Sequence, residues 1–151
     1  IVTGVQTCAL PIWFSTKQAV LDWAVEGVSQ ESETLALAAL KDSNRALEAR
    51  IVRFFMEWLG VHTSLIHKSP HGVEIFEMSK ASQSAALDAS YDRCAEALGA
   101  VLMAGGVART AETCADIVFT LMMASKGLLI FSADEAAYEV GITRVVKALL
   151  P

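Results

Sequence analysis

Apolar residues recur at intervals of three and four from Trp13 to the end of the chain, and this spacing constrains the fold more than any other feature. The clearest stripe lies in segment 47–59 and consists of Leu47, Ile51, Phe54, Phe55, Trp58 and Leu59. Three prolines among 151 residues leave long segments free to form helices. No segment alternates with the two-residue period of a strand, so the sequence predicts an all-α chain.

Capping residues suggest where the first helices begin and end. Thr16 suits the start of a helix that runs to Ser29 and Gln30, and either Asp42 or Ser43 suits the start of the next. Gly60 is expected to end that second helix. An irregular stretch is then expected from His62 to Gly72, because Pro70 interrupts any helix there.

Four further helical segments complete the pattern. A short piece is expected from Val73 to about Lys80, followed by a long helix at 84–104 that Gly105 and Gly106 stop. The two most apolar segments are a helix from Thr110 to Phe131 and a last helix from a Ser132 cap to Leu150. The chain thus contains about six helices.

Composition narrows the class of protein. With 54% hydrophobic and 19% charged residues, the chain can bury the core of one domain and is not disordered. Its net charge of -5 gives it no electrostatic reason to hold nucleic acid by itself. The most apolar stretch, 117–131, contains Lys126 and falls short of a membrane span. Three widely spaced cysteines and no secretory signal favour a cytoplasmic protein.

The first twelve residues have a different origin in our interpretation. Residues 2–12 read VTGVQTCALPI, which resembles the translation of a common short-read sequencing-library adapter over eleven consecutive positions. We therefore assign 1–12 to an adapter-derived artefact and 13–151 to a single domain.

The last two helices carry apolar residues on two faces, which one small domain cannot cover alone. A second copy of the chain would cover them by forming a four-helix interface with two-fold symmetry. The residues expected in this homodimer interface are Phe119, Met123, Gly127, Tyr138, Gly141 and Val145.

The segment Phe14-Ser15-Thr16-Lys17-Gln18-Ala19-Val20-Leu21 resembles the junction that follows the DNA-binding unit in the tetracycline-repressor (TetR) family of bacterial regulators. Phe14, Thr16, Lys17, Gln18 and Leu21 fit the family pattern, whereas the aromatic expected three residues before Phe14 is missing. The stretches Lys126-Gly127-Leu128-Leu129 and Val145-Val146-Lys147-Ala148-Leu149-Leu150 also resemble the end of the family's ligand domain.

This resemblance implies a function. It implies an effector-binding and dimerisation domain that would follow a helix-turn-helix DNA reader of about 45 residues, and this reader is missing from the chain. Operator DNA would be a partner only of the full-length protein, in which Lys17 would lie near a DNA phosphate. The alternative is a free-standing, all-helical, dimeric module that binds a small molecule or acts as an adaptor.

Large, polarizable or hydrogen-bonding side chains on successive helices suggest an effector pocket for a small hydrophobic or aromatic compound. The candidate residues are Trp58, His62, Phe76, Cys94, Leu98 and Met122. For each apolar member taken singly, ordinary core is the favoured interpretation, since stripes at helical spacing usually pack against other helices.

The sequence favours neither a metal site nor catalysis. His62, His67 and His71 follow the spacing H-x4-H-x3-H, which crosses Pro70 and lacks a fourth ligand, with Glu74 the nearest carboxylate. No nucleophile elbow, phosphate-binding loop, dinucleotide fingerprint or C-x-x-C motif occurs. We therefore expect no metal, no cofactor and no enzymatic activity.

Overall fold

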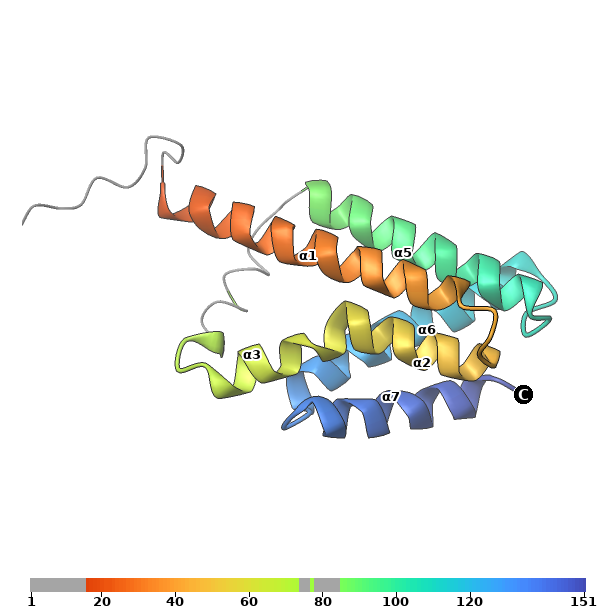
Figure 1. The fold of residues 1–151 in the computed structure, drawn as a ribbon. Coiled ribbons are helices and arrows are strands. Elements are labelled where there is room, and N and C mark those ends of the chain that lie inside the picture. Colours follow the sequence, from red (N-terminus) through yellow and green to blue (C-terminus); the bar gives the residue numbers. More distant parts are fainter. Residues whose placement is uncertain (1–15, 74–76, 78–84) are drawn as a thin grey trace, which may run out of the picture.

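The computed structural model describes residues 16–73, 77 and 85–151, and within these ranges the chain is helical with no strand (Figure 1). The prediction of an all-α chain is confirmed. The elements are α1 Lys17–Lys41, α2 Leu47–Phe55, the π-helix η1 Met56–Gly60, α3 His62–Lys68, α5 Ala85–Ala104, α6 Ala111–Phe131 and α7 Glu135–Leu149.

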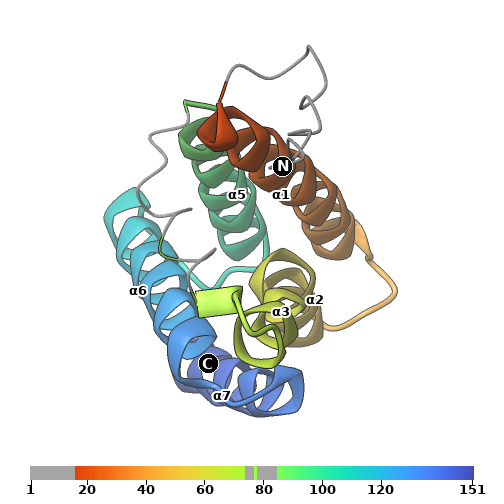
Figure 2. The same cartoon turned by 90° about the vertical axis from the view of Figure 1, so that its left-hand side faces the viewer.

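The long helices surround a central rod made of α2, η1 and α3. Figure 2, which views the bundle from one end, shows α1, α5, α6 and α7 in sequence around this rod. Neighbouring pairs pack directly, since α1 contacts α5, α5 contacts α6, and α6 contacts α7. Within the rod, α2 contacts α1 and α7, and η1 contacts α1, α6 and α7. The core is therefore bounded by helices from both ends of the chain.

Helix α1 is longer than the sequence predicted. It was expected to end at Ser29 and Gln30 but continues to Lys41, because the buried Ser32 and Glu33 make side-chain contacts with other helices. Asp42 ends α1 as its C-cap.

The expected cap of α2 was also wrong. The residue before α2 is Ala46, which makes no side-chain capping bond. The Asp42 carboxylate instead accepts hydrogen bonds from the Asn44 amide and the Arg45 guanidinium, at 3.2 and 3.0 Å.

Gly60 does not end the second helix as predicted. The helical path continues through the π-turn η1 into α3, so the stretch expected to be irregular begins with two turns of helix. A Cβ atom on Gly60 would stand 3.0 Å from Cδ1 of Tyr138 on α7. The missing side chain therefore allows α7 to approach the rod closely.

The C-terminal half follows its predicted boundaries well. Helix α5 ends before Gly106, whose φ of 71° is one that glycine adopts without strain. Thr110 caps α6 by accepting a hydrogen bond from the Thr113 amide at 3.1 Å. The predicted Ser132 cap of α7 is wrong, because Asp134 takes that role through the Ala137 amide at 2.9 Å.

Some predictions fall outside the described residues. The assignment of residues 1–12 to an adapter, and the part of the opening motif before Thr16, lie in this category. Most of the helical piece expected at 73–80 does so too.

Candidate functional site

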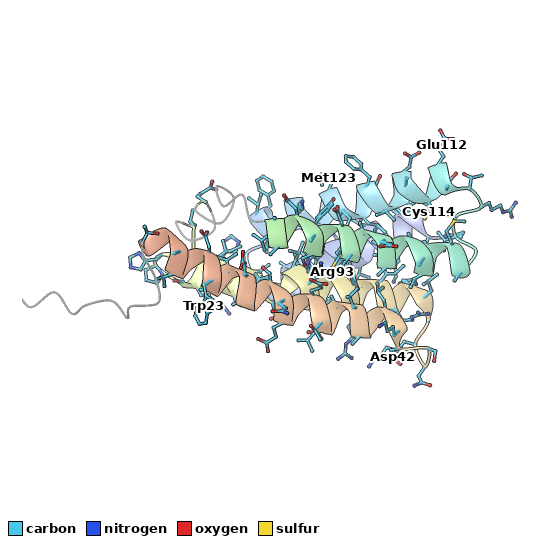
Figure 3. The ribbon with its side chains drawn as sticks, turned by 90° about the horizontal axis from the view of Figure 1, so that it is seen from above. Trp23, Asp42, Arg93, Glu112, Cys114 and Met123 are labelled. Carbon is cyan, nitrogen blue, oxygen red and sulfur yellow. The ribbon has the colours of Figure 1, made fainter. Side chains whose placement is uncertain are left out.

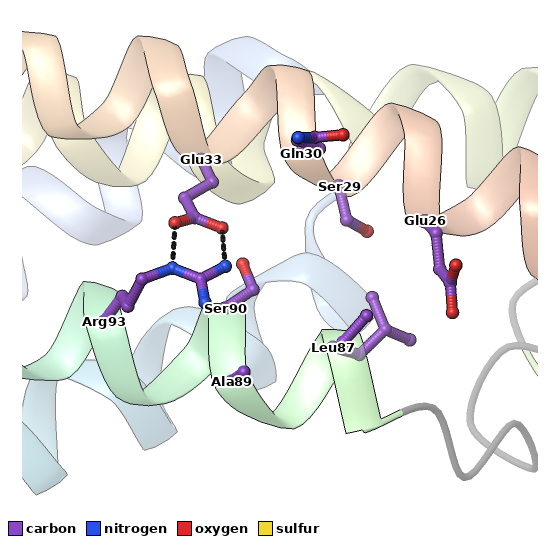
Figure 4. A pocket seen from close by; sticks show the side chains of 9 residues that line it. Glu26, Ser29, Gln30, Glu33, Leu87, Ala89, Ser90 and Arg93 are labelled. Carbon is purple, nitrogen blue, oxygen red and sulfur yellow. Dashed lines mark hydrogen bonds and ion pairs between the residues drawn. The ribbon is translucent and has the colours of Figure 1, made fainter.

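A pocket of about 230 Å³ opens between α1 and α5 (Figure 4). Among the residues that the structure describes, its lining comes from these two helices and consists of Glu26, Ser29, Gln30, Glu33, Ala86, Leu87, Ala89, Ser90 and Arg93. The four α1 residues recur at spacings of three, one and three, so they share one face of the helix.

An ion pair crosses the pocket at one end and ties α1 to α5. The Arg93 guanidinium donates two hydrogen bonds to the Glu33 carboxylate, from Nε to Oε1 at 2.6 Å and from Nη2 to Oε2 at 2.8 Å. The Glu33 side chain is 9% exposed, whereas that of Arg93 is 54% exposed. The geometry is the bidentate one in which arginine binds carboxylates most strongly.

The same contact shifts the acidity of Glu33. Its hydrogen bonds with Arg93 lower the pKa of the Glu33 carboxyl, against the opposing effect of burial, and a hydrogen bond from Ser90 acts in the same direction as Arg93. Glu33 is consequently ionised at neutral pH, and the pair links α1 to α5 on this side of the bundle.

The two walls of the pocket differ chemically. The α1 wall offers the carboxylate of Glu26, the hydroxyl of Ser29 and the amide of Gln30, whereas Ala86, Leu87 and Ala89 form an apolar part of the α5 wall. Figure 4 shows Leu87 lying across from Glu26 and Ser29. A ligand that fits this pocket needs hydrogen-bonding groups along one edge and hydrocarbon along the other.

The residues predicted for the effector pocket lie elsewhere. Trp58, Cys94, Leu98 and Met122 belong to one cluster of buried side chains in the middle of the bundle. The Trp58 ring lies 5.7 Å from that of Phe54 and 6.0 Å from that of Tyr91, measured between centroids. None of them lines the pocket between α1 and α5, and Phe76 lies outside the described residues.

His62 lies apart from the pocket as well, half-buried at the start of α3. Its Nε2 atom lies 3.2 Å from the Ser32 hydroxyl of α1, and its ring also hydrogen-bonds the backbone of Trp58. Burial lowers the pKa of His62 in spite of the Trp58 contact. The neutral imidazole therefore acts as a polar link between α1 and the central rod.

His67 and His71 do not join His62. Both are exposed, at the end of α3 and just after it. In the described ranges, no three histidine, cysteine, aspartate or glutamate side chains come together closely enough to hold a metal ion.

The expected dimer interface divides into two groups. Phe119 and Met123 are exposed on α6, and a Cβ atom on Gly127 would meet nothing within 4 Å. In Figure 3, Met123 points away from the bundle while Cys114, on the opposite face of α6, points toward α5. These α6 positions are accessible to a partner.

The α7 positions also make contacts inside the chain, and the burial of Tyr138 contradicts its prediction as an interface residue, whereas Gly141 and Val145 are half-buried. Tyr138 is fully buried, and Val145 packs against the core cluster. A Cβ atom on Gly141 would stand 2.5 Å from Cδ2 of Leu128 on α6. The small residue at 141 thus serves the packing of α7 on α6.

The two described cysteines are buried and unpaired. Burial raises the pKa of the Cys94 thiol to about 12, and the Cys114 thiol lies 3.4 Å from the Gly99 carbonyl oxygen. A thiol that stays protonated at neutral pH is a poor nucleophile, so Cys94 packs as a small apolar side chain.

Sequence reasoning missed the pocket between α1 and α5 because its polar residues resemble a solvated helix face. The available signal was the run Glu26, Ser29, Gln30 and Glu33 on one face of α1. Its ionic partner Arg93 lies 60 residues further along the chain, and helical periodicity does not pair residues at that distance.

Helix α6 is long and apolar enough to cross a membrane by length and composition, although helices of water-soluble cores pass the same test.

Lys17, the residue predicted to lie near a DNA phosphate, is the first residue of α1.

No protein-family model, curated protein or solved structure matches this chain.

Proposed function

We propose that residues 13–151 form the effector-binding and dimerisation domain of a TetR-like bacterial transcriptional regulator whose DNA reader precedes Trp13. The opening motif and the order of the helices support this proposal. Thr16 accepts a hydrogen bond from the Ala19 amide at 3.0 Å, so a helix begins within the motif, as the family pattern requires.

One observation carries the proposal. Helix α1, which starts at the motif and would continue from the DNA reader, also forms one wall of the pocket and holds Glu33 against Arg93. A ligand in this pocket would touch the linking helix directly. Because α1 is a single helix of 25 residues, a displacement at Glu26 or Glu33 would reach its first turn without an intervening hinge.

Regulation then follows from a difference in affinity. An effector that binds better to one spacing of α1 and α5 favours that spacing, and the spacing in turn changes the separation of two DNA readers in a dimer. The Glu33–Arg93 pair sets the spacing without ligand. Lys17 would lie at the DNA-proximal end of α1, where its charge adds affinity for phosphate.

The lining of the pocket changes the class of effector that we expect. The sequence favoured a hydrophobic or aromatic compound bound among Trp58, Leu98 and Met122, but those side chains pack against one another. The lining of the pocket instead suits a small amphipathic compound with hydrogen-bonding groups on the edge that faces α1. Such a ligand would lie with its hydrocarbon edge on Ala86 and Leu87.

Sequencing the source DNA upstream of Trp13 tests the proposal. We expect an in-frame segment of about 45 residues with a basic recognition helix and an aromatic residue three positions before Phe14. A native start codon close to Trp13 would contradict it and favour the free-standing module. Genomic DNA that encodes VTGVQTCALPI would contradict the assignment of residues 1–12.

A further inference from the structure

A lysine of α6 lies at the end of a row of aromatic rings. The Lys126 ammonium is 4.1 Å from the centroid of the Tyr91 ring on α5. The Tyr91 ring lies 6.0 Å from that of Trp58, and the Trp58 ring lies 5.7 Å from that of Phe54, both measured between centroids. Trp58 and Phe54 are buried, Tyr91 is half-buried and Lys126 is exposed. The row therefore leads from the core to an amine that solvent can reach.

The surroundings of Lys126 differ from those of a lysine held by a carboxylate. In the part of the chain that the structure describes, the ion pairs use other cations, namely Arg45, Arg53, Arg93 and Lys147. The negative face of the Tyr91 ring takes the place of a carboxylate beside Lys126. Burial lowers the pKa of Lys126, so a larger fraction of this amine than of an ordinary lysine is uncharged at neutral pH.

An uncharged lysine amine adds to carbonyl carbon atoms. When it reacts with an aldehyde, the nitrogen forms a bond to the carbonyl carbon and the carbon–oxygen bond breaks. Of the three protons on the original ammonium, two leave with the oxygen as water and one stays on the nitrogen. The product is a protonated imine, and neither partner is oxidised or reduced. The reaction therefore needs no reagent beyond the aldehyde.

The Tyr91 ring favours an aldehyde over an acyl donor as the reacting compound. A protonated imine is a cation and keeps its attraction to the ring face, whereas the amide that acylation forms is neutral and loses it. An aryl group joined to the nitrogen through the imine carbon can lie against the same ring in the offset arrangement that aromatic pairs prefer. An aromatic aldehyde thus makes two favourable contacts with one side chain.

We propose that Lys126 is a covalent binding site for small aromatic aldehydes, which it holds as an imine against the ring of Tyr91. Neither Lys126 nor Tyr91 lines the pocket between α1 and α5. The reaction also requires no DNA reader and no second copy of the chain. The site consequently adds to the proposed function and does not depend on it.

Reductive trapping with two aldehydes tests the site. The chain is incubated with benzaldehyde or with propanal, sodium cyanoborohydride reduces each imine to a stable secondary amine, and peptide mass spectrometry measures labelling at each lysine. Lys147 is the reference within the same chain, because its ammonium lies 3.8 Å from the Glu48 carboxylate and not over a ring. The measured quantity is the ratio of Lys126 to Lys147 labelling with benzaldehyde, divided by the same ratio with propanal. This quotient cancels the intrinsic reactivity of each amine and each aldehyde.

We expect the quotient to be about two- to tenfold in the natural chain, which is the factor that one aromatic contact contributes. Tyr91→Leu removes the ring and should bring the quotient to about one. Tyr91→Phe keeps the ring face and is the matched control, so it should retain the preference. Circular dichroism checks that both variants keep the helical fold.

Unfolding the natural chain in urea gives a second test that needs no variant. Unfolding separates α5 from α6, so Lys126 should lose its preference for benzaldehyde over propanal. A quotient near one in the folded natural chain would overturn the proposal. A preference that survives Tyr91→Leu or urea would overturn it as well, because the ring contact could not be its source. None of these results bears on the DNA upstream of Trp13, so the proposed function stands or fails separately.

Discussion

The interior around Trp58 and the groove between α1 and α5 differ in what fills them. The interior consists of apolar side chains in contact, among them Leu98 and Met122 with no exposed surface. The groove is lined by polar side chains of α1 and by both apolar and polar side chains of α5, and it has a volume of about 230 Å³. The residues best suited to bind a hydrophobic ligand are therefore also those that pack best against one another. Space remains where small and charged residues face each other across a helix pair.

The largest effect is expected from Leu98→Ala. Leu98 is fully buried on α5, so truncation should lower the free energy of unfolding by about 2–5 kcal/mol. Urea unfolding measures the loss, with Ala89→Gly in the groove as a control that leaves no cavity in the core. A loss below about 1 kcal/mol would show that the interior is loosely packed and could admit a ligand.

The next effect concerns the contact of α7 with α6. Gly141→Ala places a Cβ atom 2.5 Å from a Leu128 methyl group, and we expect a cost of about 1–3 kcal/mol for the required repacking. Thermal unfolding measures it against Gly127→Ala, which has open surroundings. Equal melting temperatures for the two variants would contradict the packing of α7 on α6.

A smaller effect is expected from the ion pair in the groove. Glu33→Gln removes the charge that Arg93 binds, and we expect a lower melting temperature at pH 7. Because Arg93 lowers the pKa of Glu33, the stabilisation is fully present above the ordinary value of 4.5 and is lost as the pH falls through the folded-state pKa. The difference between the natural chain and Glu33→Gln should therefore shrink in acid. A difference that persists below that pKa would argue against the ion pair as its source.

The smallest effect is expected at His62. Burial lowers its folded-state pKa below 6.5, so the unfolded chain binds a proton more readily than the folded chain. Stability should consequently decrease as the pH falls from 6.5 toward the folded-state pKa, with a slope of at most about 1.4 kcal/mol per pH step of one. His62→Gln should remove this part of the pH dependence, and NMR titration of the ring gives the pKa directly. A His62 pKa at or above 6.5 would contradict the burial of the neutral ring.

Prediction from the sequence succeeded where a local signal determines the structure. Thr110 and Gly106 mark helix ends through bonds and angles that involve only their neighbours, and both were located correctly. Prediction failed where a contact between helices determines where a helix ends. Ser32 and Glu33 resemble the polar end of a helix, yet contacts with His62 and Arg93 keep them inside α1.

In the candidate sites, too, features set by local signals were predicted correctly and features set by contacts between helices were not. Periodicity identified Leu98 and Met122 as inward-facing, and the structure buries both. It could not show whether inward-facing residues enclose a cavity, because that depends on how far apart the helices lie. Tyr138 was misassigned for a related reason, since the glycine at position 60 on another helix creates the room that its ring occupies.

The π-turn at Met56–Gly60 has a consequence for how this gene can vary in length. A π-turn contains one residue more than an α-turn needs, and each helical residue rotates the chain by about 100°. Because a π-turn absorbs its extra residue within one turn, deleting one residue there would regularise the hydrogen bonds and leave Thr63 and Ile66, both buried now, facing the core. A one-residue deletion in this segment should therefore be tolerated far better than one in the middle of α1 or α6, where it would rotate every later residue of the helix.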